Sequence, residues 1–137
     1  MTGPVGDLAA IQALIGTPYD IANRAPRLNC WGCFVVVQGL LGRALDAIRI
    51  EGAGAAELAR MIASHNERAR WREIAGPVHG CGVLMGRSRA PIHIGTWLDI
   101  DGGGVIHAHD PAGVVFERLP DIKAAGWRHV TFHEIDA

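Results

Sequence analysis

The sequence has little of what a disulfide-linked or membrane-spanning protein requires. It contains three cysteines in 137 residues, and this odd number leaves at least one thiol free. A cysteine count this low is typical of proteins made in a reducing compartment. No apolar stretch approaches the ~20 residues that cross a bilayer, and residues 1–7 lack a basic segment followed by an apolar one. We therefore expect synthesis in the cytoplasm without a signal peptide, and no membrane partner.

The sequence also lacks an excess of charge of either sign. Its 13 Lys and Arg against 14 Asp and Glu give a formal net charge of -1, whereas binding to phosphates needs a concentrated basic surface. The one basic cluster, 68–72, is flanked by Glu67 and Glu73, and we expect it to be a solvated helix face. Nucleic acid is therefore not expected as a partner. The length predicts a single domain over residues 1–137.

The periodicity of apolar residues divides the chain into a helical first half and a strand-rich second half. Helical spacing predicts helices over Leu8–Ile15, from Cys30 to near Gly42, and from Gly54 to about Arg70. The later segments, in chain order, are a short apolar run at 81–85, strands at 91–99, 105–109 and 114–118, a short helix at 121–125 and a last strand at 128–135. This order predicts an α+β fold with the helices packed on one side of an antiparallel sheet of about five strands.

Asn29 and Cys30 stand where a polar loop meets the second predicted helix. Asn29 is a good N-cap residue, because its side-chain oxygen can accept a backbone N–H of the first turn. Cys30 then lies at the positive end of the helix dipole. That field favours the thiolate, so the sequence predicts a lowered pKa and a reactive Cys30.

A nucleophilic cysteine needs a base, and the base needs a group that orients it. The glycine-rich segment 101–104 predicts a hairpin whose two strands carry His93 and His107. Gly95 lies on the same strand face as His93 and leaves room for a neighbour. His109 competes with His107 for this place, and we expect only one of the two to face His93.

Two segments resemble the NlpC family of papain-like cell-wall cysteine peptidases. The stretch GTPYDIANRAPRLNCWG is similar to the family's segment that ends in the nucleophilic cysteine. The stretch WREIAGPVHGCGVLMGRSRAPIHIGTWLDIDGGGVIHA is similar to its second half, with the two histidines. The tryptophan after the cysteine and the tail GVVFERL look most like the branch found in phage and prophage tails. The resemblance covers nearly the whole chain and implies a papain-like fold.

The resemblance implies a Cys-His-His triad of Cys30, His93 and His107 that hydrolyses an amide bond in peptidoglycan stem peptides. Tyr19, Asn29 and Trp31 take the family's positions for oxyanion stabilisation and substrate binding. The implied location is a phage or prophage tail acting on the bacterial cell wall, with other tail proteins as partners. No cofactor or metal is implied.

Two family acids are replaced in this chain, by Asn29 before the cysteine and by Cys81 at the start of the first family strand. These losses keep open a structural tail-tip protein that has the same fold without the chemistry. Acyl transfer to an acceptor other than water also stays open.

Cysteine spacing offers two further chemistries. A zinc module could use Cys30, Cys33, His79 and Cys81, which have the right ligand types without the usual spacing. A thioredoxin-like pair of Cys30 and Cys33 lacks the preceding strand, and Cys33 is more simply a core residue.

Overall fold

The computed structural model describes residues 7–45, 71–89 and 91–135. Two helices form the first half. Helix α1 (Leu8–Ala13) begins after Asp7, whose side chain accepts the Ala10 N–H at 3.0 Å. Helix α2 (Cys30–Leu40) begins after Asn29, as predicted. The helix predicted from Gly54 to about Arg70 lies outside the described residues.

The second half forms one antiparallel sheet of six strands in the order β1-β6-β2-β3-β4-β5. The strands are β1 (Trp71–Ile74), β2 (Gly82–Gly86), β3 (His93–Leu98), β4 (Gly104–His109), β5 (Gly113–Glu117) and β6 (His129–Ile135). The fold is therefore α+β, as predicted, with one strand more than the expected number of about five.

Strand β1 is the strand that the sequence does not predict. Its charged residues Arg72 and Glu73 favoured a solvated helix face, and this expectation is wrong for this segment. Pairing with β6 decides its structure: Trp71 lies opposite Ile135, and Arg72 Nη2 binds Glu134 Oε1 at 2.8 Å. Four residues are too few to reveal a strand before their partner is known.

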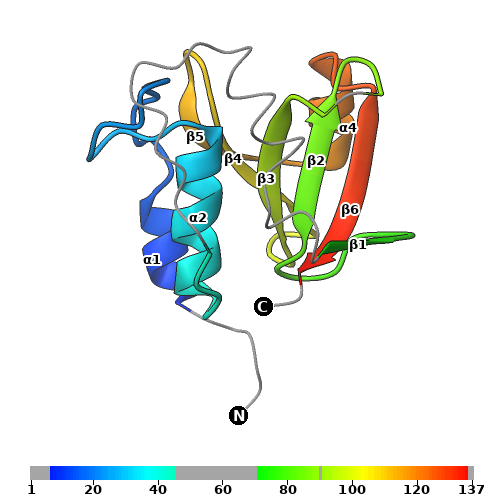
Figure 1. Cartoon of the computed structure of the whole chain (residues 1–137), viewed down its shortest axis with the longest axis horizontal. Helices are drawn as coiled ribbons and strands as arrows, with labels where there is room; N and C mark the ends of the chain where they lie inside the picture. The colour runs from blue at the N-terminus through cyan, green and yellow to red at the C-terminus, as the bar shows by residue number, and fades with distance from the viewer. Residues whose placement is uncertain (1–6, 46–70, 90, 136–137) are drawn as a thin grey trace.

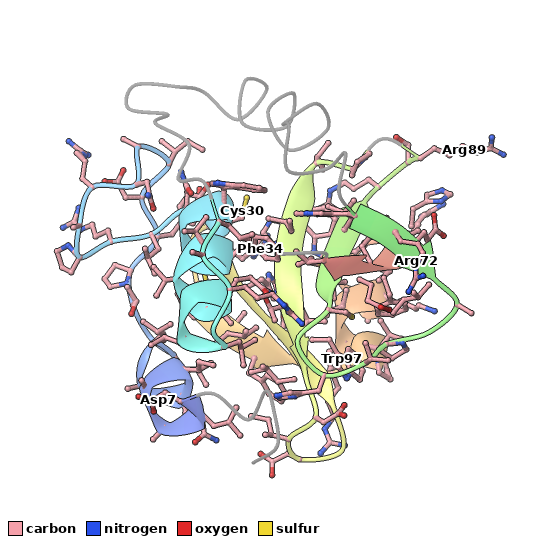
Figure 2. All side chains as sticks on the ribbon, turned by 60° about the horizontal axis from the view of Figure 1, so that its bottom comes forward. Asp7, Cys30, Phe34, Arg72, Arg89 and Trp97 are labelled. Atoms are coloured by element: carbon pink, nitrogen blue, oxygen red, sulfur yellow. The ribbon has the colours of Figure 1, made fainter. Side chains whose placement is uncertain are left out.

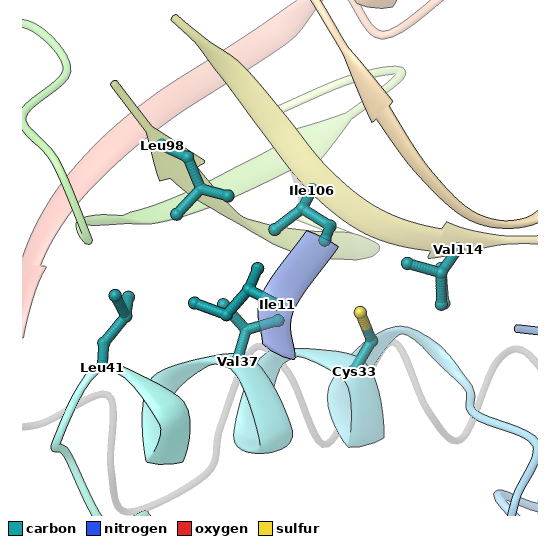
Figure 3. Close-up of a cluster of buried hydrophobic side chains, with 8 residues drawn as sticks. Ile11, Cys33, Val37, Leu41, Leu98, Ile106 and Val114 are labelled. Atoms are coloured by element: carbon teal, nitrogen blue, oxygen red, sulfur yellow. The ribbon is translucent and has the colours of Figure 1, made fainter. Parts of the chain in front are cut away.

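Helices cover both faces of the sheet (Figure 1). Helices α1 and α2 lie on one face, where Ile11, Cys33 and Val37 pack against Ile106 and other β-strand residues (Figure 3). Helix α4 (Leu119–Ala124) places Ile122 in a separate cluster on the opposite face. The expectation that all helices share one side is thus wrong for α4.

The alternation of side chains along each strand assigns neighbouring residues to opposite faces. Ile94 of β3 packs with Cys30 and Phe34 of α2, whereas the ring of His93 stacks on Trp127, on the α4 side. This alternation positions the candidate site described next. Within the described residues, no helix is long and apolar enough to cross a membrane.

Candidate functional site

Asn29 fixes the start of α2 from a wholly buried position. Its Oδ1 accepts the Gly32 N–H at 2.7 Å, and its Nδ2 donates to the Ile21 carbonyl at 3.0 Å. Its backbone N–H donates to Asn23 Oδ1 at 3.0 Å. A Cβ at position 32 would overlap the Asn23 side chain, so glycine is required there. Asn29 is 0% exposed, and these contacts give it a capping role, whereas its family position for substrate binding stays a prediction.

Trp31 is also a core residue. It is 1% exposed, its ring lies 5.5 Å from that of Phe34, and it stacks on Trp71 at 6.4 Å with an interplanar angle of 9°. These contacts join the first turn of α2 to strand β1. A substrate-binding role for Trp31, which the family position implies, has no support in this arrangement.

Cys30 lies at the first position of α2, one helical turn before Phe34 (Figure 2). The residue is 2% exposed. Burial raises the pKa of the thiol to about 12, although the backbone N–H groups of Ile94, Trp31 and Cys30 itself act in the opposite direction. The predicted lowering of the pKa is therefore wrong, because desolvation of the thiolate outweighs the field of the helix terminus.

Tyr19 belongs to the loop that leads to Cys30. It is half-buried and forms an isolated bridge with Leu28 in the loop that leads to α2. Burial raises the pKa of Tyr19 to about 12, and the nearby Cys30, Asp110 and Asp20 add to the increase. Cys30 thus contributes to the electrostatic environment of the Tyr19 hydroxyl.

His93 and His107 contact each other directly, as predicted. His93 Nε2 lies 2.7 Å from His107 Nδ1. The strand register pairs Thr96 with Ile106, which sets Gly95 opposite His107 and makes the histidine contact diagonal. A Cβ on Gly95 would lie 2.5 Å from Val105 Cγ1 and 3.0 Å from His107 Cβ. The room predicted beside Gly95 is thus filled by β4 itself.

Glu117 extends the histidine pair toward solvent. Its Oε1 lies 2.8 Å from His107 Nε2. The side chain of Glu117 is 36% exposed, whereas that of His107 is 1% exposed. The hydrogen bond to His107 lowers the pKa of Glu117 against the opposing effect of burial. The three side chains form a continuous chain from a buried imidazole to a carboxylate at the surface.

The ring of His93 is held by a stack of side chains on the α4 side of the sheet. Trp127 lies parallel to it at 4.9 Å with an interplanar angle of 8°, and the Arg87 guanidinium lies 4.6 Å from the Trp127 ring. His109 also faces His93, with ring centroids 5.8 Å apart. The expectation that only one of His107 and His109 faces His93 is wrong, because residues two apart in a strand share a face.

Burial holds the pKa of His93 well below its usual 6.5, and its electrostatic interactions with His107, His109 and Arg87 lower it further. The imidazole is therefore neutral at pH 7. The resting site thus combines a protonated thiol with a neutral imidazole, and neither group is charged.

Cys30 and His93 approach the same strand from different sides. The thiol interacts with the backbone N–H of Ile94, the residue after His93. The paired part of β3 and β4 begins only at Thr96, which leaves that N–H available to the sulfur. Within the part of the chain that the structure describes, no hydrogen bond joins the Cys30 thiol to the His93 ring.

The four residues of the zinc alternative are not brought together. Cys30, Cys33 and Cys81 belong to three different hydrophobic clusters, and His79 Nδ1 accepts the backbone N–H of Asp99 at 3.0 Å. Over residues 7–45, 71–89 and 91–135, no group of three or more His, Cys, Asp or Glu side chains has the geometry to hold a metal ion.

A cavity of about 180 Å³ lies on the β2–β6 side of the Cys30 cluster. Leu84 lines this cavity and also packs in the cluster around Cys30. Glu73 and Arg89 lie on its wall. A cavity with one acidic and one basic side chain can receive a ligand that carries both an amine and a carboxylate.

Glu117, Trp127 and Arg87 contribute to the site without having been predicted. For Glu117 a signal was present, since alternation along GVVFERL places it on the face of Val115, which pairs with His107. Arg87 comes from the connection between β2 and β3, and Trp127 from the connection between α4 and β6, where no periodicity identifies a contact.

Comparison with known proteins leaves the interpretation of the site to the geometry described above. Neither a protein-family model nor a curated protein matches this chain.

Proposed function

We propose that the protein is a cysteine hydrolase of the papain-like NlpC type, which cleaves an amide bond with Cys30 as nucleophile and His93 as general base. The observation that carries this proposal is the 2.7 Å contact between His93 and His107, on the strand whose Ile94 N–H interacts with the Cys30 thiol. A nucleophile, a base and a group that orients the base are the parts that covalent catalysis needs.

The neutral resting pair determines how the reaction begins. In the proposed reaction the sulfur attacks the carbonyl carbon, the carbonyl oxygen becomes an oxyanion, and the thiol proton passes to Nδ1 of His93. This transfer requires the start of β3 to bring the His93 ring from the α4 side toward the sulfur. The Cys30 backbone N–H and the Tyr19 hydroxyl are the proposed donors to that oxyanion. The thiol proton is transferred during the attack and not before it, because burial disfavours both the Cys30 thiolate and the His93 imidazolium.

Two further transfers complete the cycle. The tetrahedral intermediate collapses, the carbon–nitrogen bond breaks, and Nδ1 of His93 gives its proton to the leaving amine. Water then attacks the thioester and loses a proton to His93. The second intermediate collapses to a carboxylic acid, and the Cys30 sulfur leaves with the proton returned by His93.

The proposed substrate is a peptidoglycan stem peptide, and the proposed setting is a phage or prophage tail with other tail proteins as partners. Both follow from the resemblance of the two sequence segments.

The test is hydrolysis of purified muropeptides, with the new amine detected by mass spectrometry. Wild type is expected to cleave, whereas Cys30→Ala and His93→Ala are not. Cys33→Ala and His79→Gln are matched controls that should retain cleavage, because neither residue touches the proposed reacting atoms. Loss of cleavage in both controls, with one equivalent of zinc in the wild type, would instead support the zinc module. No cleavage by folded wild type would contradict the hydrolase.

A structural tail-tip role is the second candidate, and one observation favours it. Cys30 is 2% exposed, so its side chain already serves the core of the fold. For this role, Cys30→Ala particles should remain fully infective. A loss of infectivity by Cys30→Ala, with normal particle assembly, would reject it in favour of catalysis.

A further inference from the structure

We propose that Glu117 sets the direction of the hydrogen bonds through His107 and His93, and that it thereby keeps Nδ1 of His93 free of a proton. Glu117 is then a positioning residue that controls the candidate base from two rings away. The catalytic part of this inference rests on the proposed function, whereas the tautomer itself can be measured without any substrate.

The direction follows from what each atom can donate. An ionised carboxylate only accepts hydrogen bonds, so the 2.8 Å contact requires a proton on His107 Nε2. In a neutral His107 ring, Nδ1 is then an acceptor. The 2.7 Å contact therefore requires a proton on His93 Nε2. A neutral His93 with that proton presents an unprotonated Nδ1, which is the form that can accept the thiol proton.

The two rings are closely packed. His107 is 1% exposed, and β4 approaches Gly95 too closely for a side chain there. His93 is held parallel to Trp127. With both rings neutral and both contacts kept, the two hydrogen bonds reverse only together. Reversal places the proton on His93 Nδ1 and removes the base.

Glu117 is the one member of the chain that solvent reaches, at 36% side-chain exposure. The charged and titratable groups that act on it are His107 and His109 of the neighbouring strand. A carboxylate at the surface can thus determine the protonation pattern of a buried imidazole. A neutral side chain at position 117 that both donates and accepts allows the hydrogen bonds through His107 and His93 to run in either direction.

The experiment compares wild type with Glu117→Gln, using Glu134→Gln as the matched control. Glu134 is a partly exposed carboxylate of β6 that binds Arg72 at the far side of the sheet. Long-range proton–nitrogen NMR correlations on 15N-labelled protein report which imidazole nitrogen carries the proton. The His93 signals are assigned from their loss in His93→Gln, and a thermal melt checks that each variant is folded.

Wild type and Glu134→Gln are expected to show His93 protonated on Nε2, and Glu117→Gln a mixture of both tautomers. Cleavage by Glu117→Gln should fall about 10- to 100-fold in kcat with little change in KM, a typical loss when an outer partner of a reacting group is removed. A wild-type His93 protonated on Nδ1, or an unchanged tautomer in Glu117→Gln, overturns the inference. If wild type has the expected tautomer but cleaves nothing, the result contradicts the proposed function and leaves this inference standing.

Discussion

The two faces of strand β3 place buried polar side chains in different environments. On the α2 face, Cys30 lies among Leu84, Ile94 and Phe34 in an apolar environment, and burial keeps its thiol protonated. On the other face, His93 and His107 are equally buried but joined to the carboxylate of Glu117. The first face keeps the proposed nucleophile uncharged, and the second orients the proposed base. Burial alone therefore does not decide the chemistry of a buried group, because its hydrogen-bond partners differ between the two faces.

The largest expected difference between the faces comes from substituting adjacent residues. His93→Ala should reduce cleavage by about 10²–10⁴-fold, the usual contribution of a general base, with a modest effect on folding. Ile94→Ala should lower the free energy of unfolding by about 2–5 kcal/mol, because it leaves a cavity at a 0% exposed position.

Steady-state kinetics and urea denaturation of both variants check this contrast, with activity expressed per folded molecule. Equal activity losses in the two variants would show that the two faces are not functionally separate.

Gly95→Ala tests the contact between the strands. Its Cβ would meet Val105, the Ile106 carbonyl and the His107 Cβ, so β4 must shift. We expect a loss of about 1–3 kcal/mol in the free energy of unfolding and displacement of His107 from His93. Chemical denaturation and the imidazole NMR signals measure the two effects. Gly76→Ala is the control, because a Cβ there meets nothing within 4 Å. An unchanged His107 signal in Gly95→Ala would contradict the assigned packing.

Acidification should lower the free energy of unfolding through His93. The pKa of His93 is lower in the folded protein than its usual 6.5, so the unfolded chain binds the proton more readily. The stabilisation from a neutral His93 is therefore fully present above about pH 6.5. The free energy of unfolding decreases as the pH falls toward the folded pKa, by at most about 1.4 kcal/mol per pH unit for one proton. Glu117, whose pKa is also lowered, adds a loss of the same sign at more acidic pH.

Urea denaturation between pH 7 and 5 measures this slope. His93→Gln should flatten it, whereas His79→Gln should leave it as in wild type. A wild-type stability that does not change over this range would be inconsistent with a neutral, buried His93.

The smallest effect is expected at the edge of the sheet. Arg72 and Glu134 are 74% and 48% exposed, and exposed ion pairs contribute about 0.2–1 kcal/mol. Arg72→Gln should lower the free energy of unfolding by no more than that and leave cleavage unchanged. A double-mutant cycle with Glu134→Gln measures the coupling. A marked loss of activity would place this edge in the site after all.

The sequence predicted the parts of this arrangement that depend on local pattern. Asn29 before an apolar run predicted the start of α2, and alternation around the glycine-rich hairpin predicted that His93 and His107 meet. The fold class followed from the change of apolar periodicity along the chain.

Features that depend on tertiary packing were not predictable in this way. The Cys30 pKa was predicted from the helix terminus alone, yet burial against Leu84 and Ile94 dominates it. Glu117 reaches His107 only because of the register between β4 and β5, and β1 exists only because β6 pairs with it. In each case the deciding partner lies far away in the sequence.

The central claim is that Cys30 forms a covalent acyl intermediate with the help of His93. The most direct measurement is the intact mass of protein mixed with a stem peptide and quenched in acid, followed by peptide mapping. We expect an added acyl group on Cys30 in wild type, none in His93→Ala, and none on Cys33 or Cys81. Unmodified Cys30 in folded wild type, or an acyl group on another residue, would contradict it.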